Sequence, residues 1–253
     1  EELGKDEITD FLHINYSSTD HIGHRFGSNS VEVLDTYIRL DKNIEEIIDF
    51  LDDNVGVDNY IIYLTSDHGI THVPEYLSKN KIPFNEFYSL NVFDDELKKF
   101  IKNISNYNIY LDTDKILQSN YTISDIKNTI KNEFKKEPWV YDVIDFDQLD
   151  KAVTYSEDYA LNMIYYNSYP ELRGDLAFFI KPLWHKKSSS ASNHGSFRTY
   201  DTHVPIILFG YGIKKVNSYI KINVRDIAPT ISTILGISFP ALTTGNPIIS
   251  AIK

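Results

Sequence analysis

Residues 60–69 read YIIYLTSDHG, a nearly continuous run of aliphatic and aromatic side chains that ends in an acid, a histidine and a glycine. The first six residues, Tyr60–Thr65, predict a buried strand, because they are almost continuously apolar and β-branched or aromatic. Residues 11–17, FLHINYS, predict an earlier buried strand. Between the two, apolar residues recur at spacings of three and four from Leu34 to Leu51, which predicts an amphipathic helix. Strand, helix and strand in this order indicate a right-handed βαβ unit.

The rest of the chain continues this alternation. Further strands are predicted at residues 109–111, 140–146, 175–180 and 204–210. Helices are predicted over residues 122–134 and from an Asp226 cap to Leu235, and Gly236 would end the second helix. Loops, the first with a short helix, are predicted at residues 70–95 and 184–192. This order favours an α/β fold, a three-layer α/β/α sandwich with a largely parallel central sheet and a small α/β insertion.

The predicted elements form one discontinuous domain in three segments. Residues 1–95 would supply one part of the core sheet, residues 96–164 the α/β insertion, and residues 165–253 the returning part of the core sheet. The chain begins with Glu1 rather than Met and shows no signal peptide. We therefore expect a fragment or processed form of a longer protein.

The composition excludes several classes of function. The 253 residues carry a net charge of −11, which argues against nucleic acid as a structural partner. No apolar run approaches the roughly 18 residues needed to span a bilayer. The absence of cysteine excludes disulfides, cysteine-ligated metals and cysteine nucleophiles. The composition leaves the oligomeric state open.

Three short stretches combine acids and histidines close to predicted strands: STDHIGHRFG at residues 18–27, TSDHG at 65–69 and NHGS at 193–196. In open α/β sheets, ligands bind at the carboxyl ends of the strands, where loops from several strands meet. We therefore expect the acidic and imidazole groups of these three stretches to lie near one another.

The spacing within each stretch indicates which side chains could share an ion. Asp20 and His24 are four residues apart, so one helical turn would place both on one face. Asp67 and His68 follow a strand, where the next glycine permits a turn that brings both to one side. His194 adds a further imidazole. Carboxylate oxygen and imidazole nitrogen together suit Zn²⁺, and also Mn²⁺ or iron.

Each of these groups also has an ordinary structural explanation. A lone Asp–His pair is more often a surface pair or a capping turn, and Asp20 with His24 could form a simple hydrogen-bonded turn. His194, taken alone, could be a solvated loop residue. The joint pattern of two Asp–His pairs and a third histidine favours the metal hypothesis.

Five longer stretches carry a resemblance to a known family: TDFLHINYSSTDHIGHRFGSNS, YLTSDHG, NHGSFRTYDTHVPIILFGYGI, VRDIAPTISTILGI and TTGNP. Together they resemble the alkaline phosphatase superfamily, in particular the single-chain bacterial alkaline phosphatases related to nucleotide pyrophosphatase/phosphodiesterases. The resemblance implies a two-zinc phosphate-ester hydrolase. It assigns Asp20, His24 and His194 to one zinc ion, and Asp67 and His68 to the second. His203 competes for the role of His194 but does not precede a glycine, as the family's ligand does.

The resemblance also implies what this chain lacks. In the family, a nucleophilic Thr or Ser, a further Asp ligand of the second zinc and most phosphate-binding groups come from a region before the Asp-x-x-x-His motif. Here they would precede Glu1. Thr19, Thr65 and Ser66 lie near the metal motifs but match no nucleophile motif. No catalytic residue is therefore assigned within the chain, and we expect the isolated chain to be weakly active or inactive.

The function implied is that of the C-terminal part of a phosphate monoester hydrolase that acts through a phosphoenzyme on small phosphorylated substrates. A phosphodiesterase or nucleotide pyrophosphatase of the same superfamily is one alternative. A metal-binding module without catalysis is an alternative of another class. The resemblance further implies a periplasmic or secreted protein.

Overall fold

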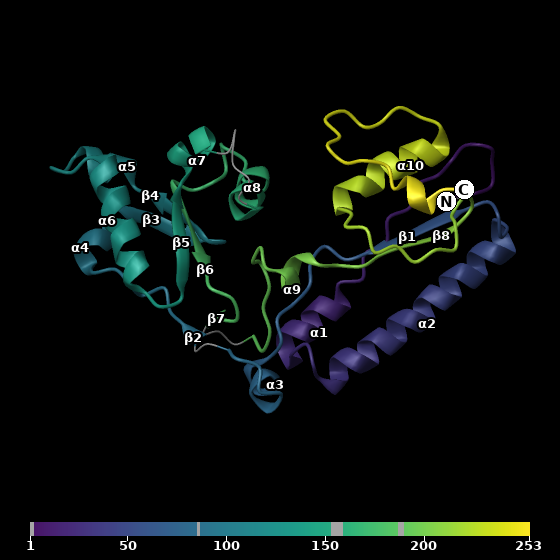
Figure 1. Cartoon of the computed structure of the whole chain (residues 1–253), viewed down its shortest axis with the longest axis horizontal. Helices are drawn as coiled ribbons and strands as arrows, with labels where there is room; N and C mark the ends of the chain where they lie inside the picture. The colour runs from purple at the N-terminus through teal and green to yellow at the C-terminus, as the bar shows by residue number, and fades with distance from the viewer. Residues whose placement is uncertain (1–2, 85–86, 153–158, 187–189) are drawn as a thin grey trace. The chain divides into compact units, whose positions relative to one another are not determined.

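The computed structural model describes residues 3–84, 87–152, 159–186 and 190–253. The chain divides into two compact units, which are described separately (Figure 1). The first unit comprises Glu1–Ile22, Val31–Gly69 and His203–Lys253, and the second comprises Gly23–Ser30 and Ile70–Thr202. The boundary falls within helix α1 (Ser18–Phe26), which is continuous.

The first unit is built around one pair of strands. The two strands are β1 (Ile61–Thr65) and β8 (Ile206–Gly210). Besides its part of α1, the unit also contains α2 (Val31–Asn54), the 3₁₀ turn η2 (Val224–Asp226), α10 (Ile227–Leu235) and the 3₁₀ turn η3 (Ile249–Ala251). Strands β1 and β8 pair antiparallel and are drawn between α2 and α10 in Figure 1. The predicted strands at 60–65 and 204–210 are therefore confirmed as strands, and so is the helix around residues 34–51. The predicted burial of the first strand is wrong, because Ile61–Leu64 are half-buried and Thr65 is exposed.

Two glycines of the first unit have backbone angles that favour glycine. Gly210, at the end of β8, has φ of 110°, and a Cβ there would lie 2.2 Å from the carbonyl oxygen of Tyr60. Gly236 has φ of 65° and ends α10, as predicted.

Asp226 was predicted to cap α10, but its side chain makes no capping bond to that helix. Instead, it accepts hydrogen bonds from the backbone N–H groups of Asn223 and Asn246, because the 3₁₀ turn η2 precedes the helix.

The second unit is an antiparallel sheet with helices on both faces. Its elements are α3 (Pro74–Lys79), β2 (Phe87–Tyr88), α4 (Asp95–Lys98), β3 (Ile101–Ser105), β4 (Asn108–Leu111), α5 (Thr113–Leu117), α6 (Ile123–Lys136), β5 (Val140–Asp145), α7 (Phe146–Ala152), α8 (Tyr159–Tyr166), β6 (Leu176–Ile180), β7 (His185–Lys186) and α9 (Thr199–Thr202). The sheet order is β3-β4-β6-β5, and β2 pairs with β7.

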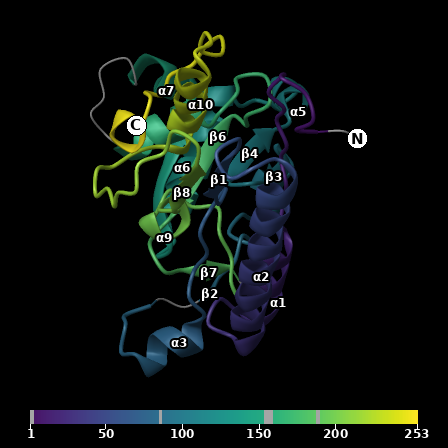
Figure 2. The same cartoon turned by 90° about the vertical axis from the view of Figure 1, so that its right-hand side faces the viewer.

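Successive side chains of β6 point to opposite faces of the sheet, and each face packs against different helices of the second unit. Phe178 packs with Phe134 of α6 and with Trp139, at ring-centroid distances of 5.0 and 6.0 Å. The neighbouring Ala177 and Phe179 pack instead with residues of α7 and α8. Figures 1 and 2 show this sheet and its helices from two directions. The continuous apolar run of β6 thus results from burial on both faces.

The α/β content is confirmed, but the largely parallel sheet is wrong. Strand pairs β1–β8, β3–β4, β4–β6 and β5–β6 are all antiparallel, and the short β2–β7 pair is parallel. An apolar run of residues favours a buried strand, but it does not indicate whether the strand runs parallel or antiparallel to its neighbours. That direction depends on the length of the connecting segments: β3 and β4 are joined by two residues, so they must be antiparallel.

Two further predictions fail for similar reasons. Residues 11–17 form no strand, because no described segment pairs with them, and Phe11 and Leu12 are 80% and 64% exposed. The right-handed βαβ unit is therefore absent from the described residues. The predicted loop at 184–192 contains β7, in which His185 is buried.

Candidate metal centre and the adjoining cavity

Helix α1 places the first Asp–His pair as its spacing predicts. Asp20 and His24 lie one turn apart on the same helix, so their side chains share a face. Gly23, between them, is buried, and a Cβ there would lie 3.2 Å from Cδ1 of Ile70. The small residue therefore allows the chain after β1 to approach this face of the helix closely.

A loop from much later in the chain is fixed to the end of α1. The N–H of Ala191 donates to the carbonyl of His24 at 2.8 Å. The carbonyl of Ser192 lies 2.8 Å from Nδ1 of His24. Because a carbonyl oxygen can only accept, Nδ1 of His24 must carry the proton, which leaves the lone pair on Nε2. A ring oriented in this way is typical of metal-binding histidines.

The same loop brings His194 to His24. Their Nε2 atoms are 3.1 Å apart. Two imidazole nitrogens bound to one tetrahedral zinc at about 2.0–2.1 Å each would lie roughly 3.3 Å apart, so the observed spacing suits a shared ion. Asp20, held by the same helix as His24, completes the group: one ligand atom from each of the three residues lies within 4.8 Å of the others.

The backbone on either side of His194 is held by hydrogen bonds. Thr71 binds the preceding residue through both its N–H and its hydroxyl, each 3.0 Å from the carbonyl oxygen of Asn193. On the other side, the buried carboxylate of Asp201 accepts from the N–H and the hydroxyl of Ser196 at 2.7 and 2.6 Å. Sequence reasoning missed Thr71 and Asp201, since neither lies in an Asp–His motif.

The two residues of the second predicted Asp–His pair lie close to each other. Asp67 and His68 follow β1, and their carboxylate and Nε2 atoms are 3.6 Å apart. The carbonyl of Gly69 lies 2.9 Å from Nδ1 of His68, so Nδ1 carries the proton. Within the part of the chain that the structure describes, these two residues join no group of three potential ligands. His203 is exposed and belongs to no such group either.

A cavity of about 320 Å³ adjoins His194 within the second unit. Its walls come from the turn between β3 and β4, from Trp184 and His185, and from residues 193–201. His194 therefore belongs both to the candidate metal group and to the wall of this cavity.

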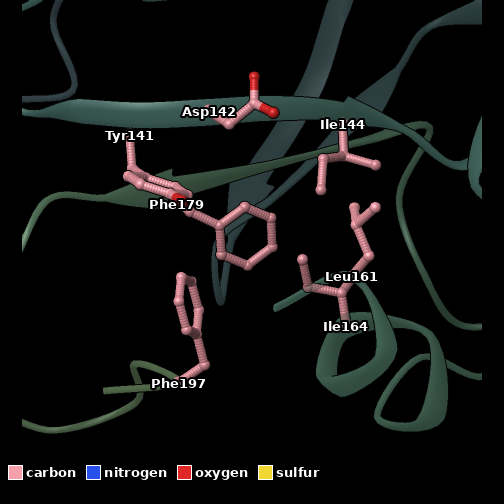
Figure 3. A pocket seen from close by; sticks show the side chains of 7 residues that line it. All are labelled: Tyr141, Asp142, Ile144, Leu161, Ile164, Phe179 and Phe197. Carbon is pink, nitrogen blue, oxygen red and sulfur yellow. The ribbon is translucent and has the colours of Figure 1, made fainter. Parts of the chain in front are cut away.

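A second cavity, of about 350 Å³, has different walls (Figure 3). It is lined by aromatic rings and aliphatic side chains, among them Phe179 and Phe197, whose centroids are 5.5 Å apart. Asp142 is the acid in its wall, and its carboxylate is already bound by the N–H of Val143 and paired with Lys135. The acidic and imidazole groups that could support catalysis therefore point to the cavity beside His194.

Burial of His185 predicts a measurable dependence of stability on pH. Its side chain is 4% exposed, and burial lowers its pKa, with a smaller opposing effect from Glu75. A lowered pKa means that the unfolded chain binds the proton more tightly, so stability falls as the pH decreases below the ordinary histidine value of about 6.5.

The matched variant His185→Gln removes this titration while keeping a polar side chain. We expect the urea midpoint of the parent chain to fall more than that of His185→Gln between about pH 7 and about pH 5. Equal decreases in the two proteins would contradict the assignment to His185.

Comparisons with known proteins identify the family of this chain. The sequence model of the family described as type I phosphodiesterase / nucleotide pyrophosphatase matches residues 1–202. Alkaline phosphatase PafA of Elizabethkingia meningoseptica is 34% identical over 99% of this chain and 47% of its own length. Alkaline phosphatase PhoV of Synechococcus elongatus is 34% identical over 100% of this chain and 47% of its own length. The chain thus spans about half the length of these curated relatives.

Solved structures give the same result for the fold. The crystal structure of wild-type alkaline phosphatase PafA matches with a TM-score of 0.91 and 33% identity, over 99% of this chain and 49% of that one. Murine ectonucleotide pyrophosphatase / phosphodiesterase 5 matches with a TM-score of 0.66 at 14% identity, over 93% of this chain and 57% of that one, which shows the fold alone.

Proposed function

Because the chain belongs to the type I phosphodiesterase / nucleotide pyrophosphatase family, we propose that it is the C-terminal part of a zinc-dependent phosphate monoester hydrolase. The observation that carries the proposal is the convergence of Asp20, His24 and His194, whose ligand atoms lie within 4.8 Å of one another. PafA and PhoV, each 34% identical to this chain, are named alkaline phosphatases, and this supports monoester hydrolysis, although a relative from Myroides odoratus that is 33% identical is named a calcium-transporting ATPase.

The three side chains fit one zinc ion. His24 and His194 would bind through Nε2 as neutral imidazoles, and Asp20 would supply a negative charge. Asp67 and His68 would supply two ligands of a second ion, whose third ligand would come from outside this chain. When bound, zinc supplies Lewis-acid stabilisation of the negative charge on the phosphoryl oxygens. Mn²⁺ or iron could occupy the same ligand set.

In this proposal, residues of this chain hold the metal ligands in place and orient them. The carbonyl of Ser192 keeps the proton of His24 on Nδ1, so that Nε2 stays available. Thr71 holds the backbone beside His194. In the proposed reaction, a Thr or Ser hydroxyl from outside the chain displaces the alcohol from the phosphate monoester through a phosphoenzyme. Water then displaces that hydroxyl, and the products are the alcohol and inorganic phosphate.

A diesterase or pyrophosphatase activity is the second candidate, because the matching family is described by those two activities. The experiment compares p-nitrophenyl phosphate with bis(p-nitrophenyl) phosphate, using the longer protein that we propose contains this chain. We expect kcat/KM for the monoester to exceed that for the diester by roughly 100-fold or more, since about 2.7 kcal/mol of transition-state preference gives that ratio. The isolated chain should show little or no turnover.

The outcomes of this comparison separate the candidates. A larger kcat/KM for the diester would favour the phosphodiesterase alternative. Bound zinc without turnover of either ester by the longer protein would indicate a metal-binding module. The variant His24→Ala should reduce both activities together, because it removes a proposed ligand rather than a substrate contact.

The proposed partner is a small phosphorylated substrate, and the proposed location is the periplasm or the outside of the cell. The net charge of −11 does not favour nucleic acid as a structural partner. Among the described residues, no helix has the length and apolar character needed to cross a membrane.

A further inference from the structure

The turn between β3 and β4 is strained and forms part of the cavity beside His194. Asn106 and Tyr107, the two turn residues, have φ of 48° and 62°. Two-residue hairpins of this kind favour Asn at the first position and Gly at the second, because both residues need positive φ. A tyrosine at the second position is unfavourable for the backbone, and such strain is concentrated at functional sites.

The ring of Tyr107 lies against the backbone next to His194. A Cβ on Gly195 would be 3.3 Å from Cε2 of Tyr107, and Gly195 itself has φ of 109°. The same ring also makes an edge contact with Phe178, with centroids 5.6 Å apart. The strained residue therefore holds an aromatic ring at the wall of the cavity, beside a proposed metal ligand.

Neutral hydrogen-bonding groups line the same cavity. The structure gives the side-chain amide of Asn106, the indole N–H of Trp184 and the hydroxyl of Tyr200 no hydrogen bond to any described residue. They are therefore available to a ligand. Neither Lys nor Arg occurs among the described lining residues, and the acid in the wall, Asp201, already accepts two hydrogen bonds from Ser196.

This combination selects one class of ligand. A second phosphate group would enter a cavity that offers no cation among its described walls, so a pyrophosphate fits poorly. Aromatic faces with neutral donors and acceptors suit a ring that has apolar faces and hydroxyl groups at its edge. A sugar ring has both features.

We propose that the cavity bounded by Tyr107, Trp184 and Tyr200 binds the sugar part of a sugar phosphate monoester. The inference rests on the proposed phosphate-ester hydrolysis, in which His24 and His194 hold the metal that receives the phosphate. Tyr107 and Trp184 provide the apolar walls, and Asn106 and Tyr200 provide hydrogen bonds to the sugar hydroxyls.

The chain contains a reporter for this binding. It has two tryptophans: Trp184 lines the cavity, whereas Trp139 is 2% exposed in the core of the second unit. A ligand in the cavity should therefore change the emission of Trp184 and leave that of Trp139 unchanged. The zinc-loaded full chain would be titrated with methyl glucoside, glucose 6-phosphate, methyl phosphate and pyrophosphate. We expect saturable changes with the first two, and tighter binding of glucose 6-phosphate than of methyl phosphate by about tenfold or more.

Two variants locate the binding. Tyr107→Gly restores the residue that the turn favours, so the hairpin should form, but glucose 6-phosphate should bind about tenfold more weakly because the ring is lost. Tyr141→Ala removes a tyrosine from the other cavity and should leave the affinity unchanged. Trp184→Phe should abolish the emission change, with binding then followed by calorimetry.

The four titrations separate failure of this inference from failure of the proposed function. Equal affinity for methyl phosphate and glucose 6-phosphate, with no effect of methyl glucoside, would overturn the sugar site and leave the phosphate site standing. Binding of methyl glucoside with no gain from the phosphate group or the metal would overturn the proposal that the cavity serves a sugar phosphate, whereas the hydrolase proposal is tested separately by the turnover of p-nitrophenyl phosphate by the longer protein. Preference for pyrophosphate, or a full effect of Tyr141→Ala, would also overturn the sugar site.

Discussion

Replacing His194 by alanine should abolish tight zinc binding at the group that it forms with Asp20 and His24. The Nε2 atoms of His194 and His24 are 3.1 Å apart, so one ion would bind both rings. Loss of an outer partner of a metal ligand weakens binding by roughly 10–100-fold, and loss of a ligand itself should weaken it by at least about 100-fold. Elemental analysis and calorimetric titration of the purified chain with zinc would measure this change.

His203→Ala is the matched control for this prediction. His203 lies nine positions later in the chain, is exposed and belongs to no described group of ligands. The control should bind zinc as the parent chain does, and thermal unfolding should show that both variants are folded. Retention of zinc by His194→Ala together with its loss in His203→Ala would exchange the roles of the two histidines.

Replacing Gly210 by alanine should destabilise the first unit by about 3 kcal/mol or more. Gly210 has φ of 110°, and a Cβ would lie 2.2 Å from the carbonyl oxygen of Tyr60 and 3.1 Å from Cα of Ile61. Both contacts are with backbone, so relief requires β8 to move away from β1 and lose paired hydrogen bonds. Backbone strain combined with lost strand pairing is among the mechanisms by which a single substitution causes a large loss of unfolding free energy.

Gly236→Ala provides the control, because Gly236 also has a positive φ but a Cβ there would meet nothing within 4 Å. Alanine in this left-handed conformation should cost about 1–2 kcal/mol. Calorimetric unfolding of the two variants beside the parent chain separates backbone conformation from collision. Equal losses of stability in the two variants would show that the contact with Tyr60 is unimportant.

The strands were predictable because each is a short run made mainly of aliphatic and aromatic residues, and the structure forms a strand at each of the runs that became β1, β5, β6 and β8. Burial was less predictable: β6 is buried, whereas Ile207 and Phe209 of β8 are exposed. Strand direction was not predictable in the same way, because pairing depends on long-range contacts. The run at residues 11–17 shows the limit: its composition indicates a strand, but the described residues offer it no partner.

The candidate metal group likewise has one part that local sequence spacing predicts and another that depends on long-range contacts. The face shared by Asp20 and His24 follows from helical spacing and needed only the sequence. The approach of His194 depends on the hydrogen bonds of Ala191 and Ser192 to His24, which join positions almost 170 residues apart. The strained Tyr107 turn left no sequence signal, because tyrosine is not a residue that such a turn favours.

The contact between His24 and His194 has a consequence for how the chain resists unfolding. These residues are 170 positions apart, and one ion bound to both would cross-link the chain there. A link across so long a segment removes much of the freedom of the unfolded chain, as a disulfide does. This chain has no cysteine and so cannot form a disulfide, and bound zinc would provide the cross-link instead. Chelation should then lower the unfolding temperature as well as remove the ion, and the protein's lifetime in dilute solution would depend on the supply of metal.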